Sequence, residues 1–264
     1  MRLIEFCDNA DAIKLTAAAV SAYSFKCNGG LPESTEYILY CPENALALEN
    51  VAIRKVFNRV LPPPIQSIMD AAPSDIPALE TQWQKATWSK FLSWVHTPCD
   101  GKPVFHADYD TLCCGSVLEA VPVAGKFFSG RLNKENEISC NGGFYVKTPE
   151  FDESDAPELM TAPVLSADVY KEAYKLWWAT DEMGVSWFFH KQGFTKFYEL
   201  DWRFNMPVYK QKRTKQSVET NDVRVLHFMG VTKPWDIKSE RCYKAQRRRW
   251  LTMKERMLNE LEIR

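Results

Sequence analysis

The sequence has no apolar run that approaches the roughly 20 residues of a membrane-spanning helix, and its N-terminus lacks the long apolar region of a signal peptide. Its eight cysteines are scattered and include no Cys-x-x-Cys pair, which argues against a zinc site and a disulfide framework. The net charge is −1, so no overall field indicates binding to nucleic acid or to membranes. We therefore expect a cytoplasmic protein without a transmembrane segment.

The 264 residues are enough for one large domain or two small ones. Apolar runs alternate with helical patterns through the first half, which favours an α/β fold with a mostly parallel sheet and ligands at the carboxyl ends of its strands. We expect helices over Asp11–Tyr23, Glu43–Val56, Pro77–Val95, Ser166–Ala179, Glu182–Gln192 and Ser239–Leu261. We expect strands over Leu3–Cys7, Glu36–Cys41, Val56–Leu61, Pro103–Ala107, Val121–Phe128, Ser139–Lys147, Phe194–Leu200 and Val223–Phe228.

The first candidate site element is a strand that ends in two carboxylates. The apolar residues Pro103–Ala107 lead directly to Asp108 and Asp110. Residues two apart on an extended chain point to the same side, so both carboxylates could converge on one hard cation. Two acids at this spacing also occur by chance in solvated turns, and the pair alone favours that simpler interpretation.

The second candidate element is the run His227-Phe-Met-Gly230-Val-Thr-Lys233-Pro-Trp235, which follows a short apolar strand. An imidazole nitrogen suits a divalent cation, and glycine lets backbone N–H groups approach phosphate oxygens closely. Lys233 adds a positive charge for the phosphates. One loop thus carries the groups that a metal-bound diphosphate needs, although a packed histidine and a tight turn with a solvated lysine are the simpler alternatives.

The two elements together, Asp-x-Asp-Thr-Leu and His-x-x-Gly-x-x-Lys-Pro-Trp, resemble the motifs of glycosyltransferase family 8. That family includes glycogenin, bacterial lipopolysaccharide galactosyl- and glucosyltransferases, and galactinol synthase. Its members have the GT-A fold and transfer a sugar from a nucleotide-sugar with retention at the anomeric carbon. Further segments that resemble family elements are Cys140–Val146, Thr180–Glu182 and Leu200–Asn205. The resemblance spans about residues 1–236 and departs from the family pattern at Tyr109, Gly142 and Glu182.

The resemblance implies a role for each matching residue. The implied metal ligands are Asp108, Asp110 and His227, and a histidine beside two carboxylates favours Mn²⁺ somewhat over Mg²⁺. The residues implied for the donor nucleotide are Asn9, Lys90, Asp108, Tyr109, Gly230 and Lys233. The resemblance further implies that Asp181 lies beside the anomeric centre and that Asn141 contacts the donor sugar. From the residues alone, Asp181 is equally well a helix N-cap and Lys90 a surface lysine.

Three of the four histidines receive no role in this interpretation. They are His96, His106 and His190, and we expect His106 to be packed on the face away from the acid pair. The remaining histidine, His227, is the candidate ligand.

The sequence therefore predicts a metal-dependent, retaining glycosyltransferase that moves a hexose from a UDP-sugar to an acceptor hydroxyl. We expect a GT-A domain over residues 1–236, with a mixed central sheet, a nucleotide-binding half of about 1–112 and an acceptor half of about 113–236. A basic helical extension follows over 237–264. The alternatives are a nucleotide-sugar hydrolase, a nucleotidyltransferase, and a non-catalytic nucleotide-sugar-binding protein.

Two basic segments flank the second site element. One is the loop Lys210–Thr220, and the other is the C-terminal helix with Arg241, Lys244, Arg247, Arg248 and Arg249. A charge run is usually a solvated face, but two such segments suggest contact with a polyanion or a membrane surface. The acceptor stays open between a glycan, a lipid-linked glycan, a protein and nucleic acid.

Overall fold

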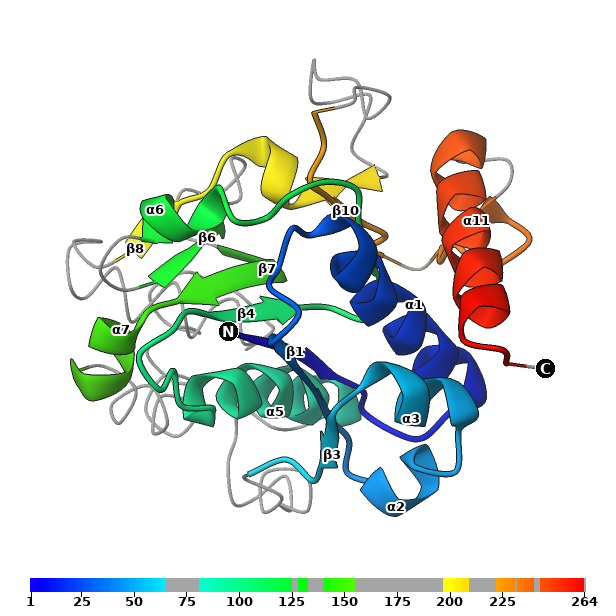
Figure 1. The fold of residues 1–264 in the computed structure, drawn as a ribbon, viewed down its shortest axis with the longest axis horizontal. Helices are drawn as coiled ribbons and strands as arrows, with labels where there is room; N and C mark the ends of the chain where they lie inside the picture. Colours follow the sequence, from blue (N-terminus) through cyan, green and yellow to red (C-terminus); the bar gives the residue numbers. More distant parts are fainter. Residues whose placement is uncertain are drawn as a thin grey trace.

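The computed structural model describes residues 1–64, 81–124, 128–132, 140–154, 197–208, 222–230, 232–239 and 243–263. Within them a seven-stranded sheet forms the centre of the molecule, and a three-stranded sheet lies beside it (Figure 1). The central sheet has the strand order β3 (Arg59–Leu61), β2 (Glu36–Tyr40), β1 (Arg2–Phe6), β4 (Val104–Ala107), β7 (Cys140–Lys147), β6 (Phe128–Leu132) and β8 (Phe197–Glu199). The small sheet has the order β5 (Thr111–Cys113), β10 (Val225–His227) and β9 (Met206–Pro207).

The central sheet is mostly parallel, as the alternating pattern predicts, and one antiparallel strand makes it the mixed sheet expected of a GT-A domain. Strands β3, β2, β1 and β4 are parallel to one another, β7 is antiparallel to both β4 and β6, and β8 is parallel to β6. The carboxyl ends of β1 and β4 therefore open at the same edge of the sheet. The predicted α/β fold class is confirmed.

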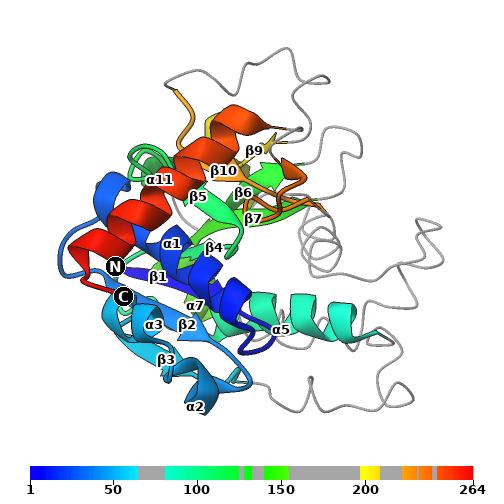
Figure 2. The ribbon, with the colours of Figure 1, turned by 90° about the vertical axis from the view of Figure 1, so that its right-hand side faces the viewer.

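Helices cover both faces of this sheet. The described helices are α1 (Ala12–Asn28), α2 (Asn44–Ala47), α3 (Val51–Val56), α5 (Gln82–His96), α6 (Ala120–Ala124), α7 (Pro149–Ser154) and α11 (Lys244–Glu260), with a short 3-10 turn at Trp202–Phe204. One face packs against α1, α3 and α11, and α11 lies across α1 (Figure 2). On the other face α5 stacks its aromatic side chains on Tyr145 and Phe151.

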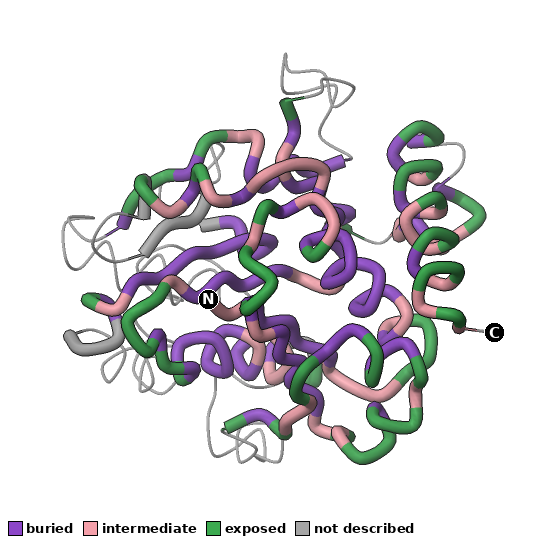
Figure 3. Tube along the Cα trace, in the orientation of Figure 1, coloured by how far each residue is buried: buried purple, intermediate pink, exposed green. Residues whose placement is uncertain are grey.

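Helix α1 is the most buried helix, and its composition explains this. Its middle consists of alanines and other small or apolar residues, so the helix can lie directly on the sheet (Figure 3). Asp11 caps its start by accepting bonds from the backbone N–H groups of Ile13 and Lys14. None of the helices that the structure describes has the length and the apolar character needed to span a bilayer.

Two predicted elements differ from the structure. The helix expected over Glu43–Val56 is broken into α2 and α3, because Asn50 leaves the helix and caps α3 through the N–H groups of Ala52 and Ile53. The strand expected over Val121–Phe128 is wrong, since Ala120–Ala124 forms α6 and β6 begins only at Phe128. A short apolar run does not distinguish a strand from a buried helical turn.

Other predicted elements agree in position but are shorter or differ in their ends. Helix α11 begins at Lys244 rather than Ser239, and α5 begins at Gln82 behind a capping box at Thr81. The strand expected from Val56 begins at Arg59, because α3 continues to Val56. The helices expected over Ser166–Ala179 and Glu182–Gln192 lie outside the described residues.

Candidate metal and diphosphate site

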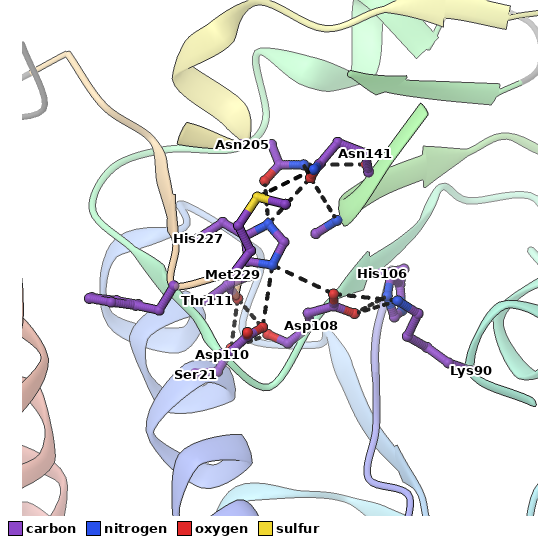
Figure 4. Close-up of polar contacts among 12 residues, drawn as sticks. Ser21, Lys90, His106, Asp108, Asp110, Thr111, Asn141, Asn205, His227 and Met229 are labelled. Carbon is purple, nitrogen blue, oxygen red and sulfur yellow. Dashed lines mark hydrogen bonds and ion pairs between the residues drawn. The ribbon is translucent and has the colours of Figure 1, made fainter. Parts of the chain in front are cut away.

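The turn between β4 and β5 carries both candidate carboxylates. Strand β4 ends at Ala107, Asp108–Asp110 form the turn, and β5 begins at Thr111. The Thr111 hydroxyl donates to the backbone oxygen of Asp108 at 2.8 Å, and the Ser21 hydroxyl of α1 lies 3.0 Å from that of Thr111. Helix α1 thus supports the turn from below and fixes where the two carboxylates lie (Figure 4).

The small sheet brings His227 to the same place. Strand β10 runs antiparallel to β5 with His227 opposite Thr111. As a result, His227 Nε2 lies 3.4 Å from a carboxylate oxygen of Asp110 and 3.7 Å from one of Asp108. One ligand atom of each residue lies within 4.8 Å of the others. The structure therefore brings together the three residues that the two sequence motifs single out.

The hydrogen bonds of His227 fit the role of a metal ligand. Its Nδ1 lies 3.0 Å from the side-chain oxygen of Asn205 and 3.3 Å from that of Asn141. Both oxygens are acceptors, so Nδ1 donates its proton to them, and Nε2 faces the carboxylates, where its lone pair would serve a bound cation. Two carboxylates and one such nitrogen form a donor set that suits Mn²⁺ or a similar divalent cation.

Glycine is required at position 143 by space. A Cβ atom on Gly143 would lie 2.1 Å from His227 Nδ1 and 2.6 Å from the Asn205 side-chain oxygen. The backbone of β7 therefore passes directly beneath the imidazole. Neither Gly143 nor Asn205 is assigned a role by the sequence motifs, although both belong to quoted segments.

Two lysines flank the carboxylates. Lys90 of α5 lies 3.1 Å from a carboxylate oxygen of Asp108. Lys233 forms an ion pair with Asp110 and also donates to the backbone oxygen of Phe228 at 3.1 Å. Each carboxylate thus has its own ammonium group, one from α5 and one from the loop after β10.

Burial alone would raise the pKa of Asp108, but Lys90, His106 and His227 outweigh it and hold this pKa well below its usual range. Burial also opposes ionisation of Asp110, and His227 and Lys233 reverse that effect, so the pKa of Asp110 is lowered as well. Both carboxylates are therefore ionised at neutral pH, as cation binding requires.

His106 contacts the site, which corrects the expectation that it packs away from the acid pair. Its Nε2 lies 3.1 Å from a carboxylate oxygen of Asp108 (Figure 4). Residues two apart on a strand share a side, and the rule that relates Asp108 to Asp110 also relates His106 to Asp108. The ring packs against both Trp94 and Tyr145, so His106 is a buried residue that orients Asp108.

A cavity of about 190 Å³ opens beside the carboxylates. Its walls include the side chains of Asp8, Lys90, Tyr109 and Lys233, together with both site carboxylates. The ring of Tyr109 stacks on Trp235 with centroids 6.2 Å apart, which joins the two motifs. Asn9 is not part of the described wall; its side chain accepts from the N–H of Asp11, and Asp8 lines the cavity in its place.

Three predicted site residues remain, and they are Gly230, Asn141 and Asp181. Gly230 has a φ of +91°, a conformation that favours glycine, and no atom would crowd a Cβ there. Asn141 accepts from the N–H of Gly143 and donates to the sulfur of Met229, in addition to its contact with His227. Asp181 lies outside the described residues.

No family model matches the chain, and no curated protein matches it. Solved structures do match. A galactosyltransferase, LgtC, solved with donor and acceptor sugar analogues, superposes with a TM-score of 0.63 at 13% identity, over 97% of this chain and 95% of that one. The chain has the GT-A glycosyltransferase fold. The glycosyltransferase GlyE of Streptococcus pneumoniae matches with a TM-score of 0.64 at 12% identity, over 98% of this chain and 63% of that one.

A eukaryotic protein has the same GT-A fold. Mouse xyloside xylosyltransferase 1 matches with a TM-score of 0.56 at 12% identity, over 86% of this chain and 96% of that one. At identities this low, the superpositions show a shared fold, and the relation to family 8 stays a resemblance.

Proposed function

We propose that this protein is a metal-dependent glycosyltransferase that moves a hexose from a UDP-sugar to an acceptor hydroxyl. The observation that carries the proposal is the convergence of Asp108, Asp110 and His227, from two separate motifs, at the carboxyl end of β4 beside a cavity. The fold of known glycosyltransferases supports it, because in such α/β sheets the ligand lies at this edge.

The metal ligands of the proposal are Asp108, Asp110 and His227, and Mn²⁺ is the favoured ion. A bound divalent cation supplies positive charge that stabilises the departing nucleoside diphosphate. Asn141 and Asn205 hold the imidazole through Nδ1, so the lone pair of Nε2 keeps its direction. His106 and Lys90 hold Asp108 from the other side.

Lys233 is the proposed diphosphate contact. In the structure its ammonium group is paired with Asp110. With a cation held by Asp110, Lys233 would be available to contact a phosphate oxygen of the donor. The backbone at Gly230 and the cavity-lining Lys90 and Tyr109 complete the proposed donor contacts, and Asn9 stays a predicted contact of the nucleoside.

Retention at the anomeric carbon belongs to the proposal through the family resemblance. The acceptor hydroxyl then attacks from the side of the leaving group, and a diphosphate oxygen takes its proton. Asp181 is the proposed residue beside the anomeric centre, and Asn141 is proposed to contact the donor sugar as well as His227. A polyanionic or membrane contact of the basic segments, the identity of the acceptor and a cytoplasmic location stay predictions.

The experiment is a panel of nucleotide-sugars incubated with Mn²⁺, Mg²⁺ or EDTA, in which release of free nucleoside diphosphate is followed. We expect release from one UDP-sugar, dependent on metal and lost in Asp110→Ala. The absence of both release and thermal stabilisation with every UDP- and GDP-sugar would reject the proposal.

The alternative functions are separated by the products and by one further variant. A hydrolase releases free sugar without an acceptor, and a nucleotidyltransferase forms pyrophosphate or a new nucleotide bond. For a glycosyltransferase, Asp181→Ala should keep metal-dependent UDP-sugar binding while transfer falls. If the unmodified protein and Asp181→Ala bind the UDP-sugar equally, and an acceptor changes nothing in either, the protein would be a non-catalytic binding protein.

A further inference from the structure

A second and larger cavity is lined by residues of α11, by Leu112 and Cys113 of β5, and by Asn28 at the end of α1. Its volume is about 590 Å³, within the range of roughly 300–1,000 Å³ typical of small-molecule sites. The α11 residues that line it recur at helical spacing along one face of the helix, and they are Ala245, Arg248, Arg249, Thr252, Met253 and Arg256. We call this cavity the α11 groove.

The described lining of the α11 groove is positively charged. It contains three arginines and no acidic residue. Arg256 pairs with Glu260 at 2.7 Å, whereas Arg248 and Arg249 are exposed and form no ion pair with any described residue. Arg249 also contacts the Cys114 thiol, but neither guanidinium group is paired with a carboxylate of the described residues. The two adjacent arginines therefore provide donors that match a phosphate.

The opposite wall of the groove is largely apolar. Leu112 of β5 and Val223 are buried in this wall, and the half-buried Cys114 faces the groove from it. From the helix side, Met253 of α11 adds a second half-buried apolar side chain. A phosphate ion would use the arginines and leave Cys114 and Met253 in contact with water. An occupant with an apolar body beside its phosphate would use both, and burial of apolar surface would add to its affinity.

The structure argues against a membrane as the occupant. The large apolar side chains of α11 pack against the core: Trp250 and Met257 are buried there, and Leu251, Met253 and Leu258 are partly buried against it. The exposed large apolar residues of the described chain lie on other segments, and they are Ile13, Leu46, Leu48, Val51, Tyr198 and Ile237. Helix α11 therefore has no apolar face with which to enter a bilayer.

We propose that the α11 groove binds a small soluble phosphate monoester with an apolar body. The phosphate lies against Arg248 and Arg249, and the apolar body lies against the partly exposed Cys114 and Met253. The groove and the donor cavity have no lining residue in common, so the two sites can be tested separately.

The experiment is a calorimetric titration of the whole protein with 1-naphthyl phosphate in EDTA, which removes divalent cations from the donor site. We expect saturable binding, with weaker binding of inorganic phosphate and of 1-naphthol because each lacks one half of the probe. The double variant Arg248→Glu/Arg249→Glu and the variant Thr252→Trp, which fills the groove without changing charge, should each weaken binding about tenfold or more.

Lys102→Glu is the control for charge. Lys102 is exposed on the loop before β4 and does not line the groove, and its substitution changes the charge by the same amount as each arginine substitution does. It should bind as the unmodified protein does. Thermal melts establish that each variant is folded. Failure of 1-naphthyl phosphate to saturate, or equal affinity in all variants, would overturn the proposal.

A parallel arm uses phosphatidylglycerol vesicles. Vesicle binding that is lost in the double arginine variant but kept in Thr252→Trp would assign the arginines to a membrane surface, and would also overturn the proposal. The readout is binding in the absence of metal, so its failure would leave the proposed glycosyl transfer untouched.

Discussion

Strand β4 has a lysine beside each of its ends, and the two lysines have different partners. At its start, Lys147 of β7 is fully buried and donates to the backbone oxygens of Val95 at 2.9 Å and Thr97 at 2.6 Å. At its end, Lys90 lies 3.1 Å from the Asp108 carboxylate, and its side chain keeps 14% of its surface exposed.

The partners determine what each lysine can do. Lys147 satisfies carbonyl oxygens at the C-terminal end of α5, where the last turn of a helix leaves acceptors unpaired and favours a positive charge. The carboxylate beside Lys90 can instead exchange its partner for a cation. The buried Lys147, bonded to backbone carbonyls, therefore contributes to stability. The partly exposed Lys90, paired with a carboxylate, contributes to ligand binding.

The largest expected effect is at the carboxylate end. Asp110→Asn should lower metal-dependent UDP release at least about a thousandfold, because it removes a charged ligand worth several kcal/mol. It should lower the unfolding free energy of the metal-free protein less than loss of Lys147 does. Kinetics with Mn²⁺ and denaturant titration in EDTA measure the two quantities. Asp100→Asn, on an exposed loop, is the control, and similar losses in both variants would contradict the assignment.

The next effect is at the opposite end. Lys147→Met should lower the unfolding free energy by about 3 kcal/mol, because it leaves buried carbonyl oxygens of α5 without their donor. Lys102→Met removes an exposed lysine and should change stability little. Urea titration of both variants decides the matter. Equal stability of the two would mean that Lys147 does not hold the end of α5.

A smaller effect is expected under His227. Gly143→Ala should weaken Mn²⁺ binding by about ten- to a hundredfold, since the added Cβ displaces the imidazole from Asn205. Gly115→Ala is the matched control, because its added Cβ meets only the side chain of Arg224. Calorimetric titration with Mn²⁺ compares the two variants. Unchanged affinity in Gly143→Ala would show that His227 does not need its observed position.

The smallest effect concerns Glu5, a buried acid on β1. Burial raises the pKa of Glu5, on β1, well above its usual range; the Ser21 hydroxyl opposes this in part, and Asp108 and Asp110 add to it. A raised folded-state pKa means that stability is full below the unfolded value of about 4.3 and is lost as pH rises toward the folded value. Glu5→Gln should therefore gain stability relative to the unmodified protein between pH 5 and pH 8. Parallel curves in metal-free urea titrations would contradict this.

The parts of the site that the sequence predicts are those with a local signal. An apolar strand followed by two acids indicates the turn at Asp108 and Asp110, and an apolar strand followed by His227 indicates the second motif. Asn205 and Gly143 have no such signal. They meet His227 only because β9 runs parallel to β10 with Pro207 beside His227, and because β7 passes beneath the ring.

The errors in the fold have the same origin. Helix α2 ends at Ala47, and Asn50 begins α3 by capping it through its own side chain, which a count of apolar residues does not detect. The run after Ala120 is too short for its period to separate a helical turn from a strand. The expectation that His106 faces away from the acid pair conflicts with the two-residue period of a strand, which places His106 on the same side as Asp108.

The antiparallel pairing of β5 with β10 joins position 111 to position 227, and so sets when the metal ligands meet during folding. Asp108 and Asp110 emerge early in synthesis, but His227 reaches them only after more than a hundred further residues have been made and the intervening loop has closed. An incomplete chain offers a cation two carboxylates in place of three ligands. Metal uptake during refolding would therefore report that the distant parts of the chain have met, and a bound cation would hold the finished fold against reopening.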